Sequence, residues 1–260
     1  MWKCVSPEGI ESYLFGTMHV RDKNAFGGLG FIQTKIQECE FYYSEMDLNN
    51  ISDPEFVRFQ IMPEGQTLRD LIPEKKYLKL EKSILRSFGF YIRPFDHFYP
   101  MILANMIQMS ILDHHSDLIL DYHLYQWAEK KGKELRYLES AKQQIELFKS
   151  IPLDIQIKSI LQLGRMPNKA KKQLTTMLED YANRNTRQLY LRSKRQLGKL
   201  RHKLLYERNE KMADKLRHEL CNSSSFVAVG AAHLFGYKGL IRLMKKSGYT
   251  VRPHMIEDEY

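Results

Sequence analysis

The chain has 260 residues, of which 43% are hydrophobic, and a formal net charge of +9 at pH 7. This is enough apolar sequence to bury a sizeable core, which excludes a disordered tail. No stretch has the roughly eighteen uninterrupted apolar residues of a membrane span, and the opening MWKCVSPEG lacks the order of a secretory leader. We therefore expect a cytoplasmic protein with no transmembrane segment, or an exported one if a leader has been removed.

Cysteine usage and the placement of charge narrow the class further. Cys4, Cys39 and Cys221 are odd in number and show no CxxC spacing, so neither a disulfide framework nor a thiolate zinc site is expected. Between Arg165 and Arg217 there are 16 Lys or Arg against 5 Asp or Glu, so the rest of the chain sums to −2. The spacing of these cations is that of a solvated helix face opposite a leucine stripe. Nucleic-acid binding is therefore not expected.

In chain order, the first elements read as a strand, a helix and a strand. YLFGTMHV at 13–20 is an apolar strand followed by a glycine, two residues and a histidine. After the Gly-rich loop FGGLG, the run FIQTKIQECE at 31–40 has helical spacing, and FYYSEMD at 41–47 is strand-like.

The middle of the chain reads mostly as helix, because apolar residues recur there at i, i+3 and i+4. One exception is KELRYLES, which predicts a short strand ending at Glu139, with Ser140 able to cap the next helix. The helical stretches are 54–62, 80–90, 101–112, 117–132 and 169–220.

The C-terminal region repeats the order of the N-terminal one. FVAVGAAHLFG at 226–236 is again strand, glycine, two residues and histidine, followed by a helical run at 237–248 and a strand at 249–256. Two βαβ units, each with parallel strands, indicate an internal duplication. We predict an α/β (α+β) fold in one domain, 1–260. Its sheet-forming halves would be about 1–50 and 222–257, with a mainly helical insertion at about 54–220.

Two histidines occupy matching places in these units. Gly16 with His19 and Gly230 with His233 form GxxH motifs directly after strands. Ligands of open α/β sheets gather where parallel strands end, and a glycine lets the backbone leave the strand sharply before the imidazole. If the two units pack side by side, the two histidines approach one another.

Two carboxylates follow the strand after the first motif. Alternation along the strand puts Glu45 and Asp47 on one face and Met46 on the other. Two imidazoles and one or two carboxylates would form a divalent-metal site, or a metal-free site in which Glu orients His against water. The alternative is structural, with hydrogen-bonded boundary histidines and solvated carboxylates. The repeated spacing favours function.

Charged residues also interrupt apolar helix faces. Arg208 falls in the stripe between Leu204 and Met212, so it needs an anionic partner, either a structural carboxylate or the site cluster. Asn209 beside it adds hydrogen-bonding capacity. Asp121 is placed similarly, on a helix that is apolar on several sides.

A second group of residues, Asp113, His114, His115 and His123, looks like a metal cluster on paper. Their spacings do not put them on one helix face, so we interpret them as surface residues.

The chain resembles the TraB/GumN family, which includes the Tiki-type metalloproteases and is distantly similar to erythromycin esterases and haem-binding ChaN proteins. The blocks that carry the resemblance run in family order over nearly the whole chain, and the ordered set is specific. They are WKCVSPEGIESYLFGTMHV, FYYSEMDL, PEGQTLRDLIP, RPFDHFYPMILANM, LDYHLYQWAEKKGKELRYLES, YERNEKMADKL and FVAVGAAHLFGYKGLIRLMKKSGYTV.

The resemblance implies a two-unit α/β sheet with helical insertions. For Tiki-type members it also implies peptide hydrolysis that depends on a divalent cation, Mn²⁺ or Co²⁺, with Zn²⁺ as a further candidate. Other members silence a peptide pheromone, so membership does not guarantee catalysis. The family's motifs fall on Gly16, His19, Gly230 and His233, its acidic residue falls on Glu45, and further positions with site-shaping or structural roles fall on Asp121, Glu139, Arg208 and Asn209.

The favoured hypothesis is a peptidase in which His19, Glu45 and His233, or a subset of them, hold a divalent cation that makes a bound water acidic. Asp47 or Glu45 would act as general base, and Arg208 would stabilise the oxyanion. Two alternatives stay open: a peptide-binding or sequestering protein with little turnover, and a metal-free hydrolase with a histidine as base. The partner expected is a peptide or protein substrate. The sequence does not indicate an oligomeric state.

Overall fold

The structure is a computed structural model that describes residues 1–19, 26–49, 53–63, 65–110 and 119–257. The chain divides into two compact units, and each is described by itself. The sheet unit comprises Met1–Leu48, Ser116–Ser140 and Met177–Tyr260, and the helical unit comprises Asn49–His115 and Ala141–Thr176.

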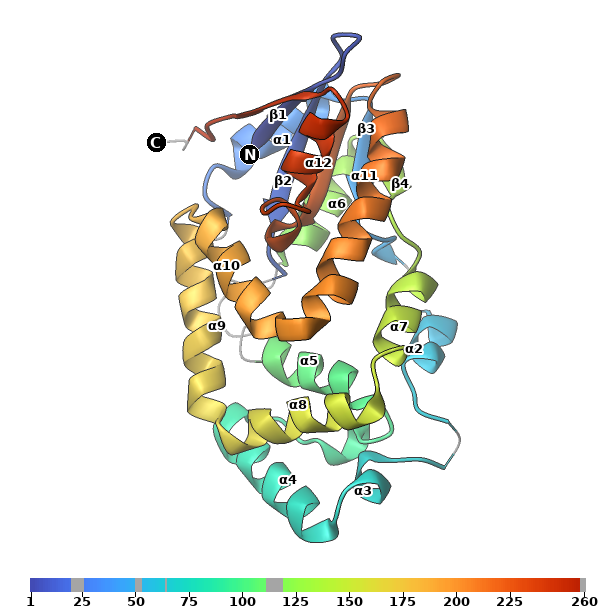
Figure 1. The fold of residues 1–260 in the computed structure, drawn as a ribbon, viewed down its shortest axis with the longest axis vertical. Coiled ribbons are helices and arrows are strands. Elements are labelled where there is room, and N and C mark those ends of the chain that lie inside the picture. Colours follow the sequence, from blue (N-terminus) through green and yellow to red (C-terminus); the bar gives the residue numbers. More distant parts are fainter. Residues whose placement is uncertain (20–25, 50–52, 64, 111–118, 258–260) are drawn as a thin grey trace. The chain divides into compact units, whose positions relative to one another are not determined.

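The sheet unit is built on a mixed sheet whose strand order, within the described residues, is β4-β3-β5-β2-β1-β6 (Figure 1). The neighbours β4, β3, β5 and β2 pair in parallel, whereas β1 pairs antiparallel with β2 and with β6. The strands are β1 (Trp2–Val5), β2 (Glu11–Thr17), β3 (Phe41–Ser44), β4 (Glu134–Tyr137), β5 (Ser225–Gly230) and β6 (Thr250–Pro253). The predicted α/β class is confirmed.

The two strands that carry the GxxH motifs are parallel neighbours, as the interpretation of the motifs required. Their register pairs Gly16 with Val229 and Thr17 with Gly230, so both motifs leave the sheet at the same end, where the two strands finish. The strand-helix-strand order also occurs twice, as β2-α1-β3 and β5-α12-β6. In the sheet, one strand (β5) lies between β2 and β3, whereas two strands (β2 and β1) lie between β5 and β6. Internal duplication stays a prediction.

Helices cover both faces of this sheet. The helices of the sheet unit are α1 (Leu29–Glu38), α6 (Leu120–Lys130), α10 (Thr186–Leu197), α11 (Glu207–Glu219) and α12 (Leu240–Lys246), with short turns η4 (Gly198–Leu200), η5 (His202–Tyr206) and η6 (Ala231–His233). In Figure 1, α11 and α12 lie in front of the sheet and α6 lies behind it.

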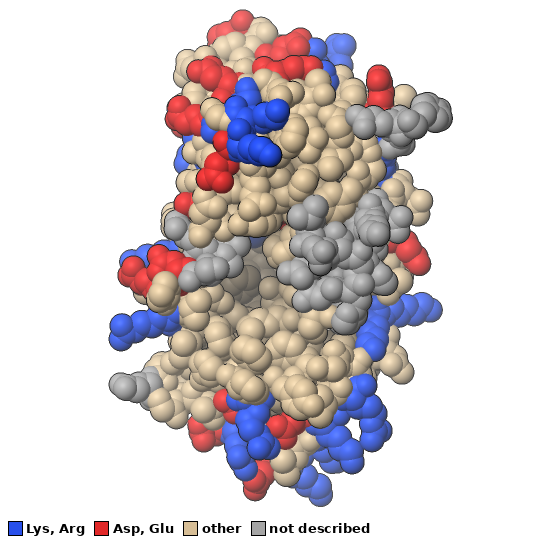
Figure 2. All heavy atoms as spheres, turned by 180° about the vertical axis from the view of Figure 1, so that it is seen from behind, with Lys and Arg blue, Asp and Glu red and all other residues tan. Residues whose placement is uncertain are grey.

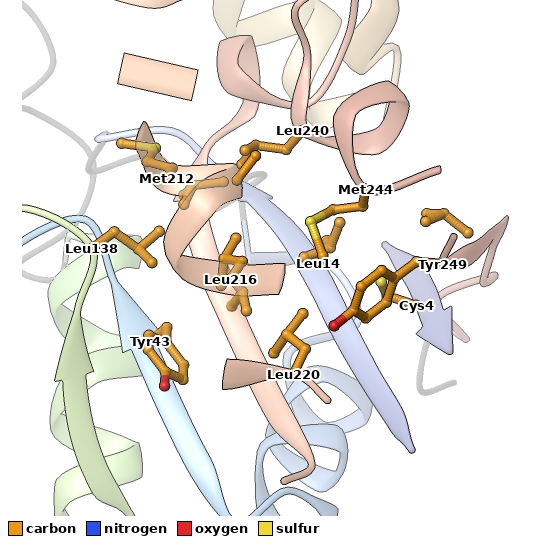
Figure 3. Packing of buried hydrophobic residues seen from close by; sticks show 14 of the residues in the cluster. Cys4, Leu14, Tyr43, Leu138, Met212, Leu216, Leu220, Leu240, Met244 and Tyr249 are labelled. Atoms are coloured by element: carbon orange, nitrogen blue, oxygen red, sulfur yellow. The ribbon is translucent and has the colours of Figure 1, made fainter. Parts of the chain in front are cut away.

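On the face of the sheet covered by α11 and α12, apolar side chains of these two helices pack onto alternate residues of the strands (Figure 3). Leu216 of α11 and Met244 of α12 belong to one buried cluster with Leu14 of β2 and Tyr43 of β3. On the α6 side, the ring of Tyr42 stacks on Phe226 of β5. Each such side chain, fully buried, stabilises the fold by roughly 1.5–3 kcal/mol relative to an exposed one.

The stretch 169–220, which was predicted as helical, is not one continuous helix. It is divided into α9 (Pro167–Ala182), α10 and α11, with a 3₁₀ turn, η4, and a π-helical turn, η5, before α11. Arg184 has φ 57° and Gly198 has φ 53°, and a residue in that region cannot continue a right-handed helix. Apolar spacing alone does not register such breaks.

The helical unit packs around a core of its own. Its elements are α2 (Pro54–Phe59), α3 (Leu68–Leu71), α4 (Glu74–Phe88), η3 (Arg93–Phe95), α5 (Pro100–Ser110), α7 (Ala141–Lys149), α8 (Leu153–Arg165) and the first part of α9. Tyr77 and Ile84 of α4, Leu103 of α5 and Ile160 of α8 are buried together. Figure 2 shows Lys and Arg side chains gathered at the end that carries α4 in Figure 1, mixed with Asp and Glu.

None of the helices in the described residues combines the length and hydrophobicity that a membrane crossing needs. Asp113, His114 and His115, which we interpreted as surface residues, lie outside the described residues. His123 is half-buried, and its ring meets Gln33 of α1 and the edge of Phe26.

Candidate active site

The candidate site lies at the carboxyl ends of three neighbouring parallel strands. Glu45 follows β3, Glu139 follows β4, and His233 follows β5. The backbone N–H of Glu139 donates to the carbonyl of Glu45 at 2.8 Å, so the two carboxylate residues are held side by side. Strand pairing therefore fixes where these side chains start.

Arg208 lies between these two carboxylates. Its Nη2 donates to Oε2 of Glu45 and to Oε2 of Glu139, both at 2.6 Å. Its Nε donates to both oxygens of Glu139 at 3.0 Å. The anionic partners that its place in the apolar stripe required are therefore present, and they include the site carboxylate Glu45.

The remaining N–H groups of Arg208 also have partners. Nη1 donates to the carbonyl of Leu204 at 3.5 Å and lies 3.4 Å from Nε2 of His233. A guanidinium has five N–H groups, and here four are directed at oxygen acceptors while the fifth lies against Nε2 of His233. In this arrangement Arg208 organises its neighbours, and it would have to exchange one of them to bind a substrate oxyanion. The π-helical turn η5 directly precedes α11, in which Arg208 is the second residue, and such turns recur at functional sites.

Glu45 is held from the sheet as well. The backbone N–H of Gly230 donates to its Oε1 at 2.7 Å, and Nε2 of His233 lies 3.7 Å from the same oxygen. The side chain of Glu45 is 24% exposed and that of His233 is 7% exposed. Glu45 is thus the member of this pair that solvent reaches.

The other ring nitrogen of His233 faces Asn209. Nδ1 of His233 lies 2.5 Å from Oδ1 of Asn209. The amide nitrogen of Asn209 donates to the carbonyl of His233 at 3.3 Å and to that of Lys238 at 2.7 Å. The imidazole is therefore fixed on both sides.

Burial and charge set the protonation of this cluster. Burial alone would raise the pKa of Glu45, but the charges of His233 and Arg208 and the N–H of Gly230 outweigh it and hold the pKa at about 2. Burial lowers the pKa of His233 to about 4, helped by Arg208 and opposed by the two glutamates. Since the imidazole is then neutral at neutral pH, Arg208 and Gly230 account for the ionised Glu45 there.

The two motif glycines are needed for space. We predicted that glycine lets the backbone leave the strand sharply, but this reason is wrong for Gly230, whose φ of −52° suits any residue. A Cβ on Gly230 would lie 3.1 Å from Oε1 of Glu45, and one on Gly16 would lie 3.0 Å from the Cα of Ala231. The glycines let Glu45 and the His233 turn come close to the strands.

His19 is held by a different partner. It lies two residues beyond β2, and its Nδ1 is 3.2 Å from Oδ2 of Asp121, in the first turn of α6. Their side chains are 49% and 19% exposed. Among the residues that the structure describes, no group of three or more His, Cys, Asp or Glu is placed to hold a metal ion. The described cluster joins Glu45 with His233, and His19 contacts Asp121 instead.

Asp47 contacts Tyr125 of α6, whereas Glu45 contacts Arg208 of α11 on the opposite face of the sheet, so the prediction that the two share a face is wrong. The hydroxyl of Tyr125, in α6, donates to Oδ1 of Asp47 at 2.8 Å and lies 3.0 Å from the hydroxyl of Tyr137. The reason is that β3 ends at Ser44, so alternation no longer applies beyond it. Sequence reasoning missed both tyrosines, because an aromatic in an apolar stripe gives no sign that its hydroxyl is used.

Some residues of the candidate site suit a metal ion, and one does not. Glu45 and His233 have the protonation states of metal ligands at neutral pH, and a side-chain oxygen at Nδ1 is the usual way to orient a ligating imidazole. The guanidinium of Arg208 does not fit, because it lies 2.6 Å from Glu45 and 3.4 Å from Nε2 of His233 and would repel a cation held there. As arranged, the described residues do not form a three-ligand site.

The fold and this edge cluster define an α/β protein whose candidate site is a partly buried set of two carboxylates, one guanidinium and one imidazole. The chain belongs to the TraB/PrgY/gumN family, which it matches over residues 1–253. Comparison with curated proteins and with solved structures found no match.

Proposed function

We propose that the protein is a hydrolase, in the first place a peptidase, and that the strand-edge cluster is its catalytic centre. One observation carries the proposal. Two acceptor atoms, Oε1 of Glu45 and Nε2 of His233, converge 3.7 Å apart where ligands of parallel sheets gather. Family membership supports the site, since the family's acidic residue and second GxxH histidine correspond to this pair.

Two acceptors at this separation suit one water molecule that donates a hydrogen bond to each. Such a water has its lone pairs turned away from both groups and toward a bound carbonyl carbon. As it attacks the amide, its proton passes to Nε2 of His233, and the imidazolium then gives this proton to the amide nitrogen as the C–N bond breaks, which releases the amine and leaves the other product as a carboxylic acid. Both carboxylates stabilise the resulting imidazolium, since Glu45 and Glu139 raise the pKa of this histidine.

Arg208 has an organising role in this scheme. It holds both carboxylates by short charge-assisted hydrogen bonds, which keeps Glu45 beside His233. A tetrahedral intermediate would bind Nη1, whose hydrogen bonds, at 3.4 and 3.5 Å, are the longest in the cluster and the easiest to exchange.

A second candidate is a peptide-binding protein of the same fold with little turnover. The observation in its favour is that the resting cluster is saturated with hydrogen bonds. A carboxylate whose pKa is about 2 and an imidazole whose pKa is about 4 are also weak bases at neutral pH. Binding of a peptide that leaves it intact would be the sign of this function.

Whether the proposed hydrolysis depends on Mn²⁺ or Co²⁺ is a separate question. Glu45 and His233 could contribute ligands only if Arg208 withdrew from Glu45, and His19 would have to join them through Nε2, since its Nδ1 faces Asp121. Thermal unfolding with each cation tests this, because an ion that binds the folded chain raises its Tm in a concentration-dependent way. A rise that disappears in His233→Ala would support metal binding at the cluster.

The decisive experiment is hydrolysis of a mixed peptide pool, followed by mass spectrometry, with chelator or with added Mn²⁺ or Co²⁺. Glu45→Gln and His233→Ala are expected to lower the rate by about 10²–10⁴-fold. Glu210→Gln, a change on the same helix as Arg208 at a side chain 43% exposed, serves as the control. Equal rates in all variants would contradict the hydrolase. Binding without cleavage by the wild type would favour the second candidate.

A further inference from the structure

The side-chain amide of Asn209 has one acceptable orientation. Its Nδ2 faces two backbone carbonyls, those of His233 and Lys238, at 3.3 and 2.7 Å. A carbonyl oxygen can only accept, so the NH₂ end of the amide must point there. The opposite orientation would set an amide oxygen against two carbonyl oxygens. The hydrogen-bond network therefore assigns the amide orientation, with Nδ2 toward the two carbonyls.

This orientation decides which ring nitrogen of His233 carries the proton. Oδ1 of Asn209, an acceptor, lies 2.5 Å from Nδ1, so Nδ1 must donate. On the other side of the ring, Nη1 of Arg208 lies 3.4 Å from Nε2, and a guanidinium N–H can only donate. One nitrogen is thus met by an acceptor and the other by a donor.

We propose that Asn209 is a positioning residue that holds His233 in its Nδ1–H tautomer, with Nε2 as the acceptor turned toward Glu45 and Arg208. The inference deepens the proposed function, since it rests on His233 serving that site. Asn209 does not touch substrate in this scheme. It acts through His233, by the general rule that the partner of one ring nitrogen sets the state of the other.

An amide suits this position better than a carboxylate. Asn209 is completely buried, and an Asp there would face the carbonyl oxygens of His233 and Lys238 without a proton to donate. The same amide also ties the segment after η6 to α11 through Lys238. A purely structural role in fastening this segment is therefore the alternative that an experiment has to separate.

The other GxxH histidine has a related contact, which supports the inference. Nδ1 of His19 meets Oδ2 of Asp121, so it too faces a side-chain oxygen from a helix. In both motifs the nitrogen nearer the backbone is engaged by such an oxygen. For Asp121 the partner is a carboxylate and for Asn209 it is an amide.

The test is ¹⁵N NMR of the full-length protein labelled at histidine, measured with chelator, with the His233 signals assigned by their absence in His233→Ala. The wild type is expected to show a protonated Nδ1 and an unprotonated Nε2. In Asn209→Leu we expect the other tautomer to appear beside the wild-type one, because Arg208 still donates toward Nε2, with kcat lower by about tenfold or more and KM little changed. Asn209→Asp keeps an acceptor at Nδ1, so it should restore the wild-type tautomer.

Glu210→Gln is the matched control for a structural role. It weakens the ion pair by which Lys238 fastens the same segment to α11, without touching the ring of His233. Its His233 signals are expected to match those of the wild type.

A wild-type ring protonated at Nε2, or an unchanged tautomer in Asn209→Leu, would overturn the inference. If the wild type cleaves no peptide, the proposed function fails and the spectra still decide the tautomer. If Asn209→Leu does not fold, the wild-type spectrum and Asn209→Asp decide.

Discussion

Arg208 and Glu139 make a two-atom contact, in which both Nε and Nη2 of the guanidinium donate to the carboxylate at 2.6–3.0 Å. The side chains are 16% and 9% exposed, so little water competes for this pair. The contact joins α11 to the end of β4 and fixes the plane of the guanidinium. That plane directs the remaining donors at Glu45 and His233.

Replacing Arg208 with Met should therefore destabilise the fold strongly. The variant leaves Glu45 and Glu139 facing each other in a poorly hydrated site, and breaking a buried ion pair in this way costs about 3–5 kcal/mol. Urea denaturation at pH 7 measures the change. The control is Arg217→Gln, also on α11, whose pair with Asp214 is 46% and 62% exposed and is worth at most about 1 kcal/mol. Equal losses in the two variants would contradict the buried network.

The stability contribution of His233 should be lost in a defined pH range. Its folded pKa, about 4, is lower than its ordinary value of 6.5 because burial disfavours the charge, so the unfolded chain binds the proton more readily. Stability is then full above pH 6.5 and falls as the pH drops toward 4. The free energy of unfolding against pH should show this fall in the wild type and a smaller one in His233→Gln. The control is the exposed His218→Gln, and an identical profile for wild type and His233→Gln would refute the expectation.

The stability contribution of Glu45 should be lost in a lower pH range than that of His233. Its folded pKa, about 2, is below the ordinary value of 4.5, so the folded state holds the carboxylate and the unfolded chain takes up the proton first. Its contribution is present above pH 4.5 and is lost as the pH falls toward 2. Acid unfolding followed by circular dichroism should therefore be shallower in Glu45→Gln. Glu55→Gln, an exposed change in the helical unit, is the control and should keep the wild-type steepness.

Alanine at the two motif glycines should have different effects. In Gly16→Ala the new methyl would meet the backbone of Ala231 at 3.0 Å, and backbone cannot move aside cheaply. We expect a clear loss of stability, of about 1–3 kcal/mol. In Gly230→Ala the methyl meets Oε1 of Glu45 at 3.1 Å, and a side chain can shift by a few tenths of an ångström. This variant should keep more stability and lose activity, which urea denaturation and the peptide assay distinguish.

Much of the fold and the centre of the site could be predicted from local patterns. Strand and helix periodicity gave the α/β class, and the repeated GxxH spacing indicated two parallel strands that end at one edge. The place of Arg208 in an apolar stripe predicted an anionic partner. Each of these features depends on residues close in sequence, or on the single rule that parallel strands share an edge.

The rest depended on contacts between distant segments. Nothing near Glu139 signals that it lies beside Arg208, which is 69 positions away, and only family resemblance pointed to it. Asp47 was assigned to the wrong face because the end of β3 is set by its pairing partners. His19 was expected to approach His233, and nothing in its spacing indicated the contact that it makes with Asp121, in the first turn of α6. Spacing along the chain does not encode such pairings.

The pair of His19 and Asp121 allows a final test of whether the first motif serves the same site as the second. Because both side chains are partly exposed, Asp121→Asn should change the stability by no more than about 1 kcal/mol. If His19 takes part in the reaction, Asp121→Asn and His19→Ala should each lower kcat by about tenfold or more. The double variant should then lose little beyond His19→Ala, because residues that act as a unit are non-additive. The peptide assay measures all three. No loss in His19→Ala would remove His19 from the catalytic centre, and losses that multiply independently would show that Asp121 does not act through His19.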